Sequence, residues 1–233
     1  MYQLLGRVRF SEVGEDEHLT LHHLINYFQD CGTFHLEALG LGADYFISQD
    51  LAFYLVSWQI EVNRLPKLAE SIKVGTLIYE CKGMFGYRNY ILYDEFDEIL
   101  AVANVCGVFL NAKTGEFVRL LPEEIAKYPI EEKIEMNYLP RKIRVPKYDQ
   151  VFDEIKIQQF QIDTNGHVNN SQYAAMALDY LPKDFKYKMV RIEYKKAAKV
   201  NDRLLPTLTI EEGTYYISLC DEQLTPYVIL AFL

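Results

Sequence analysis

The sequence predicts an α+β protein of two tandem domains, each a long helix packed against an antiparallel β-sheet. Three observations predict this class. A segment of helical periodicity followed by several strand-like segments occurs twice along the 233 residues. The strands succeed one another through short turns. Half of the residues are hydrophobic and 14% are aromatic, which is enough for a sizeable core.

The first helix follows a polar turn at residues 11–18. Leu21, Leu24, Ile25, Phe28 and Phe34 recur at helical intervals, as expected for one buried face. Strand-like runs rich in β-branched and aromatic residues come next. They span residues 53–65, 72–84, 86–96 and 98–111, with turn signals at 93–98 and 111–116.

The second half repeats this order. A polar turn at 163–170 precedes a helix whose apolar stripe is Val168, Tyr173, Met176, Ala177 and Tyr180. Strands are predicted at 189–200, 204–213, 214–222 and 227–233. The two halves align through Ile60-Glu61-Val62 and Ile192-Glu193-Tyr194, and His18 and His167 each come just ahead of a helix.

These patterns divide the chain into an N-terminal domain at 1–120, a linker at 121–150 and a C-terminal domain at 151–233. The linker is charged, contains four prolines and opens with a short helical turn at 122–128.

The net charge of −9 argues against a general nucleic-acid binder. Its distribution is uneven: residues 1–140 carry −10, residues 141–203 carry +5 and residues 204–233 carry −4. A basic zone suits an acidic substrate or partner, although an ordinary solvated surface explains it equally well.

The four cysteines are scattered and show no paired spacing, as in reduced thiols of a cytoplasmic protein. Neither a membrane-spanning run nor a signal peptide is recognisable. The histidines have no metal-ligand spacing, so we expect no metal and no cofactor.

The turn DTNGHVNN at 163–170 is the strongest candidate for a site. As chemistry, His167 suits a general base because imidazole titrates near neutral pH, Asp163 can orient it, and Asn165 can hold a carbonyl or a water. The helix start adds N–H groups suited to an oxyanion. As structure, the same turn is a well-capped helix start, with Asn169 and Asn170 as caps. His18 lacks the neighbouring asparagines and is expected to be structural.

The motif D-x-N-x-H-V-N-N-x-x-Y at 163–173 resembles that of the acyl-acyl carrier protein thioesterases, the plant plastid enzymes and their bacterial relatives. Segments 9–35, 58–76 and 82–95 add to the resemblance, which covers nearly the whole chain in family order. It implies a double hotdog fold, a thiolester hydrolase of fatty acid biosynthesis, and an acyl pocket in the first half.

The resemblance also implies a site. Asp163, Asn165 and His167 match the catalytic acid, asparagine and histidine, and we assign Asn169, Trp58 and Glu193 to substrate binding. The family's catalytic strand glutamate falls on Ala197 here, and the cysteine that follows it in the plant enzymes falls on Ala198. Glu193 matches the first glutamate of that run. On a continuous strand it would share a face with Ala197, about 13 Å away.

The partner implied is an acidic acyl carrier protein bearing a phosphopantetheine-linked acyl chain. Nucleic acid and membrane are not expected as partners, and the chain is expected to be a monomer or a homodimer. The basic segment supplies the candidate contacts with the carrier, which are Arg141, Lys142, Arg144, Lys195 and Lys196.

Two other functions stay open at this point. A hotdog dehydratase acting on 3-hydroxyacyl thioesters would use a histidine and an acid to remove and return a proton. A non-catalytic acyl-carrier binding protein would explain the missing glutamate at Ala197.

Overall fold

The computed structural model describes residues 1–183 and 185–233, which form two compact units. The first unit comprises Met1–Val56 and Ile60–Leu139, and the second comprises Ser57–Gln59 and Pro140–Leu233. In the described residues, no helix is both long enough and apolar enough to cross a membrane.

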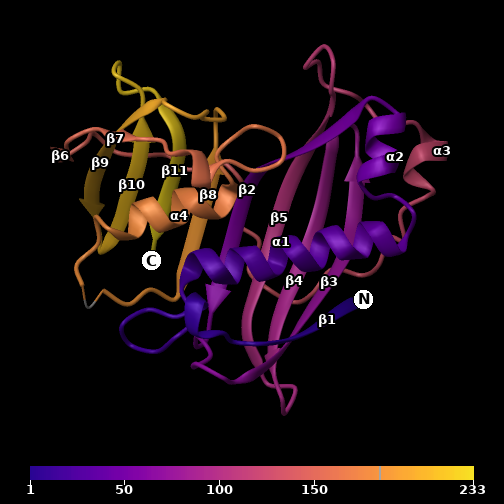
Figure 1. Cartoon of the computed structure of the whole chain (residues 1–233), viewed down its shortest axis with the longest axis horizontal. Helices are drawn as coiled ribbons and strands as arrows, with labels where there is room; N and C mark the ends of the chain where they lie inside the picture. Colours follow the sequence, from indigo (N-terminus) through magenta and orange to yellow (C-terminus); the bar gives the residue numbers. More distant parts are fainter. Residues whose placement is uncertain (184) are drawn as a thin grey trace. The chain divides into compact units, whose positions relative to one another are not determined.

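The first unit contains one long helix and an antiparallel sheet (Figure 1). Its sheet has the strand order β1-β3-β4-β5-β2. The elements are β1 (Tyr2–Arg7), η1 (Phe10–Glu12), α1 (Leu21–Ala38), α2 (Ala43–Ser48), β2 (Leu51–Val62), β3 (Ser71–Lys82), β4 (Phe85–Asp94), β5 (Ile99–Asn111) and α3 (Pro122–Ile125). The predicted helix and four predicted strands are thus present, and β1 and α2 are additional.

Helix α1 lies across its sheet and buries the predicted side chains Leu21, Leu24, Ile25 and Phe28. The stripe does not continue through Phe34, which is 45% exposed. Six residues beyond Phe28 is the wrong phase for a helix with 3.6 residues per turn. Cys31, Gly32 and His35 continue the buried face instead.

The second unit repeats the helix and the sheet, with the strand order β8-β11-β10-β9-β6 and β7 paired to β9. Its elements are β6 (Gln150–Val151), β7 (Ile155–Lys156), η2 (Gln159–Gln161), α4 (Asn170–Leu178), β8 (Met189–Tyr194), β9 (Arg203–Glu211), β10 (Thr214–Cys220) and β11 (Pro226–Phe232).

Helix α4 has nine residues, half the length of α1, so the second helix is not long as predicted. Tyr173, Met176 and Ala177 form its buried face. Pro182 lies four residues beyond its end and disfavours a helical residue before it, and Tyr180 lies outside the helix.

The duplication is visible in individual backbone hydrogen bonds. In the first unit, Gly14 N donates to His18 O (3.0 Å), and Thr20 N donates to Glu12 O (3.0 Å). In the second unit, Asp163 N donates to His167 O (2.8 Å), and Asn169 N donates to Gln161 O (2.9 Å). Both pairs keep the same spacing, so His18 and His167 occupy equivalent positions.

The strand ends repeat in the same way. Ala69 and Asn201 both have left-handed backbones, with φ of 68° and 70°. Leu19 N donates to Pro66 O, and Val168 N donates to Ala198 O, each over 2.8 Å. This equivalence places Ala197 opposite Leu65 and supports the predicted alignment of Ile60-Glu61-Val62 with Ile192-Glu193-Tyr194.

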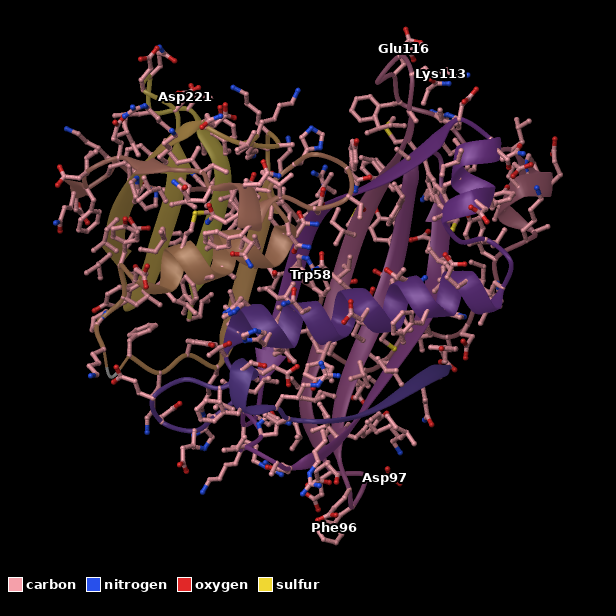
Figure 2. The ribbon with its side chains drawn as sticks, in the orientation of Figure 1. Trp58, Phe96, Asp97, Lys113, Glu116 and Asp221 are labelled. Carbon is pink, nitrogen blue, oxygen red and sulfur yellow. The ribbon has the colours of Figure 1, made fainter. Side chains whose placement is uncertain are left out.

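Turns join or follow several of these strands. Phe96 and Asp97 lie in the turn between β4 and β5, Lys113 and Glu116 follow β5, and Asp221 lies between β10 and β11 (Figure 2). The four cysteines are free thiols.

Candidate active site

The turn before α4 is held by the carboxylate of Asp163. Its Oδ1 accepts the backbone N–H groups of Asn165 (2.8 Å) and His167 (3.3 Å). Gly166 donates its N–H to Asp163 O (3.1 Å) and has φ of 74°, a conformation that favours glycine. The contacts of Asp163 therefore fix the main chain on both sides of the turn, including that of His167.

Asn169 is the N-cap of α4, as one of the two interpretations of the motif predicts. Its Oδ1 accepts the N–H and the hydroxyl of Ser171, both over 2.9 Å. This cap lies two residues after His167, and the helix begins at the next residue, Asn170. A contact of Asn169 with substrate stays a prediction.

Four N–H groups at the helix start have acceptors, so they are not free to bind an oxyanion as expected. Val168 N donates to Ala198 O, Asn169 N to Gln161 O, and Gln172 N to Asn169 O. Ser171 N is taken by the cap. Because these donors already have acceptors, the side-chain amide of Asn165 is the better candidate to hold a carbonyl oxygen.

Asn165 is exposed and His167 is half-buried, so both lie on the accessible side of the turn. His167 combines accessibility with a main chain fixed at both its N–H and its C=O. That combination suits a group that exchanges protons with a bound molecule.

A loop after β8 is fastened directly beside this turn. Ala198 O accepts from Val168 N, and Ala198 N donates to the hydroxyl of Tyr173 (2.9 Å). Ala197 is exposed on this loop. Ala197 precedes Ala198, and His167 precedes Val168. The hydrogen bond between Ala198 and Val168 therefore brings the main chain at Ala197 close to that at His167.

The predicted strand at 189–200 therefore ends early. Strand β8 stops at Tyr194, because Lys195 and Lys196 both donate their N–H to Tyr227 O (2.8 and 3.1 Å) and break the strand pairing. The expectation that Glu193 and Ala197 share a strand face is wrong for this reason.

Glu193 is 2% exposed, and both of its oxygens have partners. They accept from Ile143 N (2.8 Å) and from the ammonium of Lys195 (2.6 Å). The hydrogen bond from Ile143 attaches the segment before β6 to strand β8 of the second unit. Trp58 is 1% exposed and lies midway along β2 (Figure 2). The substrate roles assigned to Glu193 and Trp58 stay predictions.

Two tyrosines support the site, and the sequence patterns assigned them no role in it. Tyr173 is 2% exposed and receives the Ala198 N–H, and burial raises its pKa to about 12. Tyr194 donates to Asn170 O (3.0 Å) at the start of α4. The signal was present in the motif, because Tyr173 is its last residue, but its helical spacing indicated only packing.

In the first unit, the equivalent His18 is tied to its own turn. Its Nδ1 lies 2.7 Å from Asp16 O, and Asp16 Oδ1 accepts the His18 N–H (3.1 Å). Glu17 takes the place of Gly166, with φ of 61°. These local contacts fit the structural role expected for His18.

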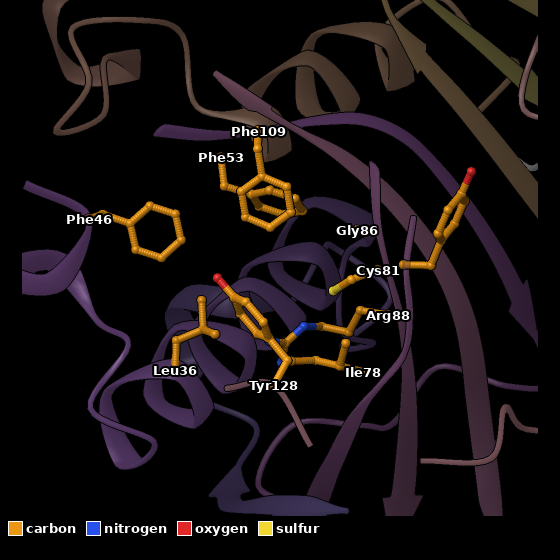
Figure 3. A pocket seen from close by; sticks show the side chains of 10 residues that line it. Leu36, Phe46, Phe53, Ile78, Cys81, Gly86, Arg88, Phe109 and Tyr128 are labelled. Carbon is orange, nitrogen blue, oxygen red and sulfur yellow. The ribbon is translucent and has the colours of Figure 1, made fainter. Parts of the chain in front are cut away.

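The first unit contains an apolar pocket beneath the end of α1 (Figure 3). Its walls come from α1, α2, β2, β3, β4, β5 and the segment after α3. They are Leu36, Phe46, Phe53, Ile78, Cys81, Gly86, Tyr87, Arg88, Phe109 and Tyr128.

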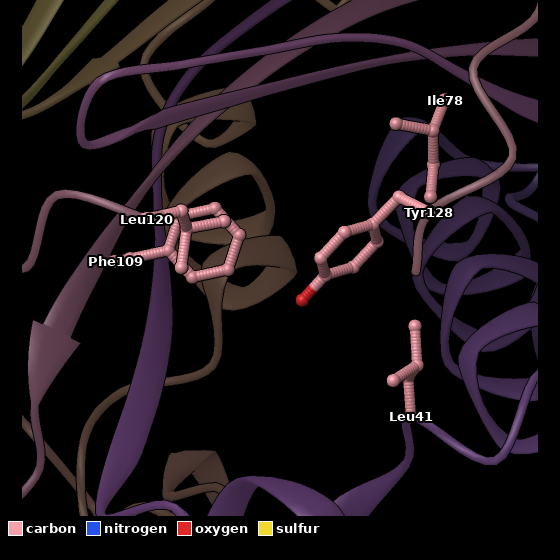
Figure 4. Packing of buried hydrophobic residues seen from close by; sticks show 5 residues of the cluster. All are labelled: Leu41, Ile78, Phe109, Leu120 and Tyr128. Carbon is pink, nitrogen blue, oxygen red and sulfur yellow. The ribbon is translucent and has the colours of Figure 1, made fainter. Parts of the chain in front are cut away.

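The pocket borders a buried hydrophobic cluster of Leu41, Ile78, Phe109, Leu120 and Tyr128 (Figure 4). Its cavity of about 30 Å³ holds only about two water molecules. A ligand of any length therefore requires the aromatic side chains to move.

Two solved structures share the fold of this chain. A putative oleoyl thioesterase from Lactobacillus plantarum superposes with a TM-score of 0.89 over 99% of this chain and 94% of its own, at 23% identity. An acyl-ACP thioesterase from Bacteroides thetaiotaomicron gives 0.90 over 99% and 96%, at 20% identity. The fold is the predicted double hotdog.

The chain belongs to the acyl-ACP thioesterase family. The family's N-terminal domain matches residues 2–128 and its C-terminal domain matches residues 144–220. A chloroplastic acyl-[acyl-carrier-protein] hydrolase of Cuphea viscosissima is 29% identical over 187 residues, 75% of this chain and 45% of the relative. The chain thus spans less than half the length of this curated relative.

Proposed function

We propose that this protein hydrolyses acyl thioesters carried on acyl carrier protein, releasing free fatty acid and carrier in fatty acid biosynthesis. The observation that carries the proposal is the accessible His167, held in a fixed turn by Asp163, in a chain of the acyl-ACP thioesterase family. The family membership favours hydrolysis over dehydration. A cytoplasmic location stays a prediction.

The side chains of the turn supply the groups that the reaction needs. His167 accepts a proton from water as the oxygen attacks the thioester carbonyl carbon. The amide of Asn165 donates to the carbonyl oxygen while it carries negative charge. The C–S bond then breaks, and the thiolate leaves with the proton from the imidazolium. Asp163 acts through the main chain of the turn, because its carboxylate holds the N–H of His167.

Because of Ala197, water activation in this chain depends more on the histidine than it would with the family's glutamate. The family resemblance gives a glutamate at this place, and here an exposed methyl group stands beside the turn. A methyl group neither accepts nor donates a proton, so water activation falls to His167.

The acyl chain is assigned to the pocket of the first unit. Its walls are almost entirely apolar, which suits a hydrocarbon chain. Phe53 lies over Gly107, where an added Cβ would come within 2.2 Å of the ring. Gly107 thus leaves room for the Phe53 ring at the pocket wall.

The acidic carrier is assigned to the basic part of the second unit. Ile143 is buried and hydrogen-bonded to Glu193, so that Arg141, Lys142 and Arg144 lie exposed on either side of it. Lys195 is the weaker candidate, because its ammonium is paired with Glu193.

Thiol release from acyl carrier protein loaded with different acyl groups tests the proposal, with the corresponding coenzyme A thioesters in parallel. We expect His167→Ala to lower the rate by at least about a hundredfold, the scale of a lost general base. His18→Ala is the matched control and is expected to retain the wild-type rate. Equal rates in the two variants would overturn the site.

Two outcomes would replace the proposed activity. Binding of the loaded carrier without any thiol release would identify an acyl-carrier binding protein. Dehydration of 3-hydroxyacyl thioesters, with no release from saturated ones, would identify a dehydratase.

A further inference from the structure

Arg88 is the single charged residue among the side chains that line the pocket of the first unit. It lies on β4, two residues before Tyr90, whose ring stacks on Phe28 of α1 at 5.1 Å. Arg88 therefore shares the strand face that is turned towards α1. Its side chain runs beside Tyr128 at the pocket (Figure 3).

The guanidinium is held by two neutral acceptors. Nη1 donates to Nδ1 of His35 and to Oγ1 of Thr76, both over 3.2 Å. The Thr76 hydroxyl donates to Asn89 O (2.9 Å), so it is oriented to accept from Arg88. His35 is 5% exposed, and burial together with Arg88 lowers its pKa to about 4. It is neutral at neutral pH and accepts at Nδ1.

These two bonds use two of the five N–H donors of a guanidinium. Among residues 1–183 and 185–233, none accepts from Nε or Nη2 of Arg88, and no carboxylate forms an ion pair with it. A cation with unused donors at the wall of an apolar pocket favours a ligand that brings an oxygen acceptor.

We infer that this pocket binds acyl chains whose far end carries an oxygen acceptor, above all a carboxylate, and that Arg88 recognises it. The inference rests on the proposed function for the thioester end of the ligand. A chain ending in a methyl group offers these three donors no acceptor. A carboxylate takes two of them in the paired geometry that guanidinium favours.

The test uses amide analogues of acyl-pantetheine thioesters, which bind but are not hydrolysed. Each carboxylate-ended chain is paired with a methyl-ended chain of the same carbon number, from short to long. We expect calorimetry to show the carboxylate-ended member bound at least about tenfold more tightly by the wild type. Arg88→Met should abolish this ratio, and Arg88→Lys should retain part of it.

Arg119→Met is the matched control, because Arg119 is an exposed arginine of the same unit outside the pocket. It should keep the wild-type ratio. The inference is overturned if the wild type binds the methyl-ended member of every pair as well or better, or binds neither. The wild-type ratio decides this even if Arg88→Met does not fold.

Thiol release separates this inference from the proposed function. Hydrolysis of carrier-linked thioesters with no preference in binding would remove the role of Arg88 alone. If the binding preference is found but no thioester is hydrolysed, the role of Arg88 in the pocket stands and the proposed activity is wrong.

Discussion

Tyr173→Phe removes one hydroxyl and tests whether the loop at Ala197 is held in place by this side chain. Tyr173 and Ala198 are 2% and 0% exposed, and the Ala198 N–H donates to the hydroxyl over 2.9 Å. Leaving a buried donor without an acceptor costs about 1–3 kcal/mol. For a chain of this size, we expect the melting temperature to fall by about 2–4 °C for each kcal/mol lost.

The same change should slow catalysis, because Ala198 O holds the N–H next to His167. We expect kcat for thiol release to fall about tenfold with little change in KM, as for a small misplacement of a catalytic group. Tyr180→Phe is the control, since Tyr180 lies in the same unit and its ring contact with Phe152 needs no hydroxyl. Equal melting temperatures for the two variants would refute the reasoning.

Asp163→Asn keeps a side-chain oxygen that can accept the N–H groups of the turn, so it should retain most of the stability that Asp163→Ala loses. A large fall in kcat for Asp163→Asn at unchanged stability would instead show that the negative charge acts on His167. Gly107→Ala should destabilise the protein by about 1–3 kcal/mol through overpacking against Phe53, and thiol-release assays should show the largest loss for long chains. Ala197→Glu should raise kcat by restoring a carboxylate beside the turn, with Ala197→Gln as the uncharged control. The His35 pKa is lowered to about 4 by burial, so the unfolded chain binds the proton first on acidification. Stability should therefore fall between pH 7 and pH 4.5, by about 2 kcal/mol from this residue, and denaturant unfolding of His35→Gln should lack this loss.

The helices and strands that carry periodic patterns were predictable from sequence. The buried side of α1 and the alignment of Ile60 with Ile192 in the two halves follow from spacing alone, and the cap at Asn169 follows from residue type. The patterns did not reveal β1, because six residues with half-exposed side chains carry little signal. They also overestimated α4, where a proline four residues downstream limits the helix.

The site was predictable where its contacts are local in the sequence. Asp163 and His167 are four residues apart, and the turn between them depends on backbone conformation at Gly166. Ala197 was misplaced because a main-chain irregularity opposite Tyr227 ends β8. The pocket drew on seven separate segments, so no local pattern could have paired Arg88 with His35 and Thr76.

The two units show how few side chains separate a structural turn from a candidate reaction site. The backbone hydrogen bonds around His18 and His167 are equivalent, so the frame alone does not make a histidine reactive. In the first unit, the acid is Asp16, and His18 Nδ1 lies against the backbone oxygen of that same residue. In the second unit, the acid is at the first position of the turn, where Asp163 accepts the N–H groups of Asn165 and His167. The chemistry we assign to His167 therefore depends on residues around a shared turn, and exchanging those residues between the two turns should move it.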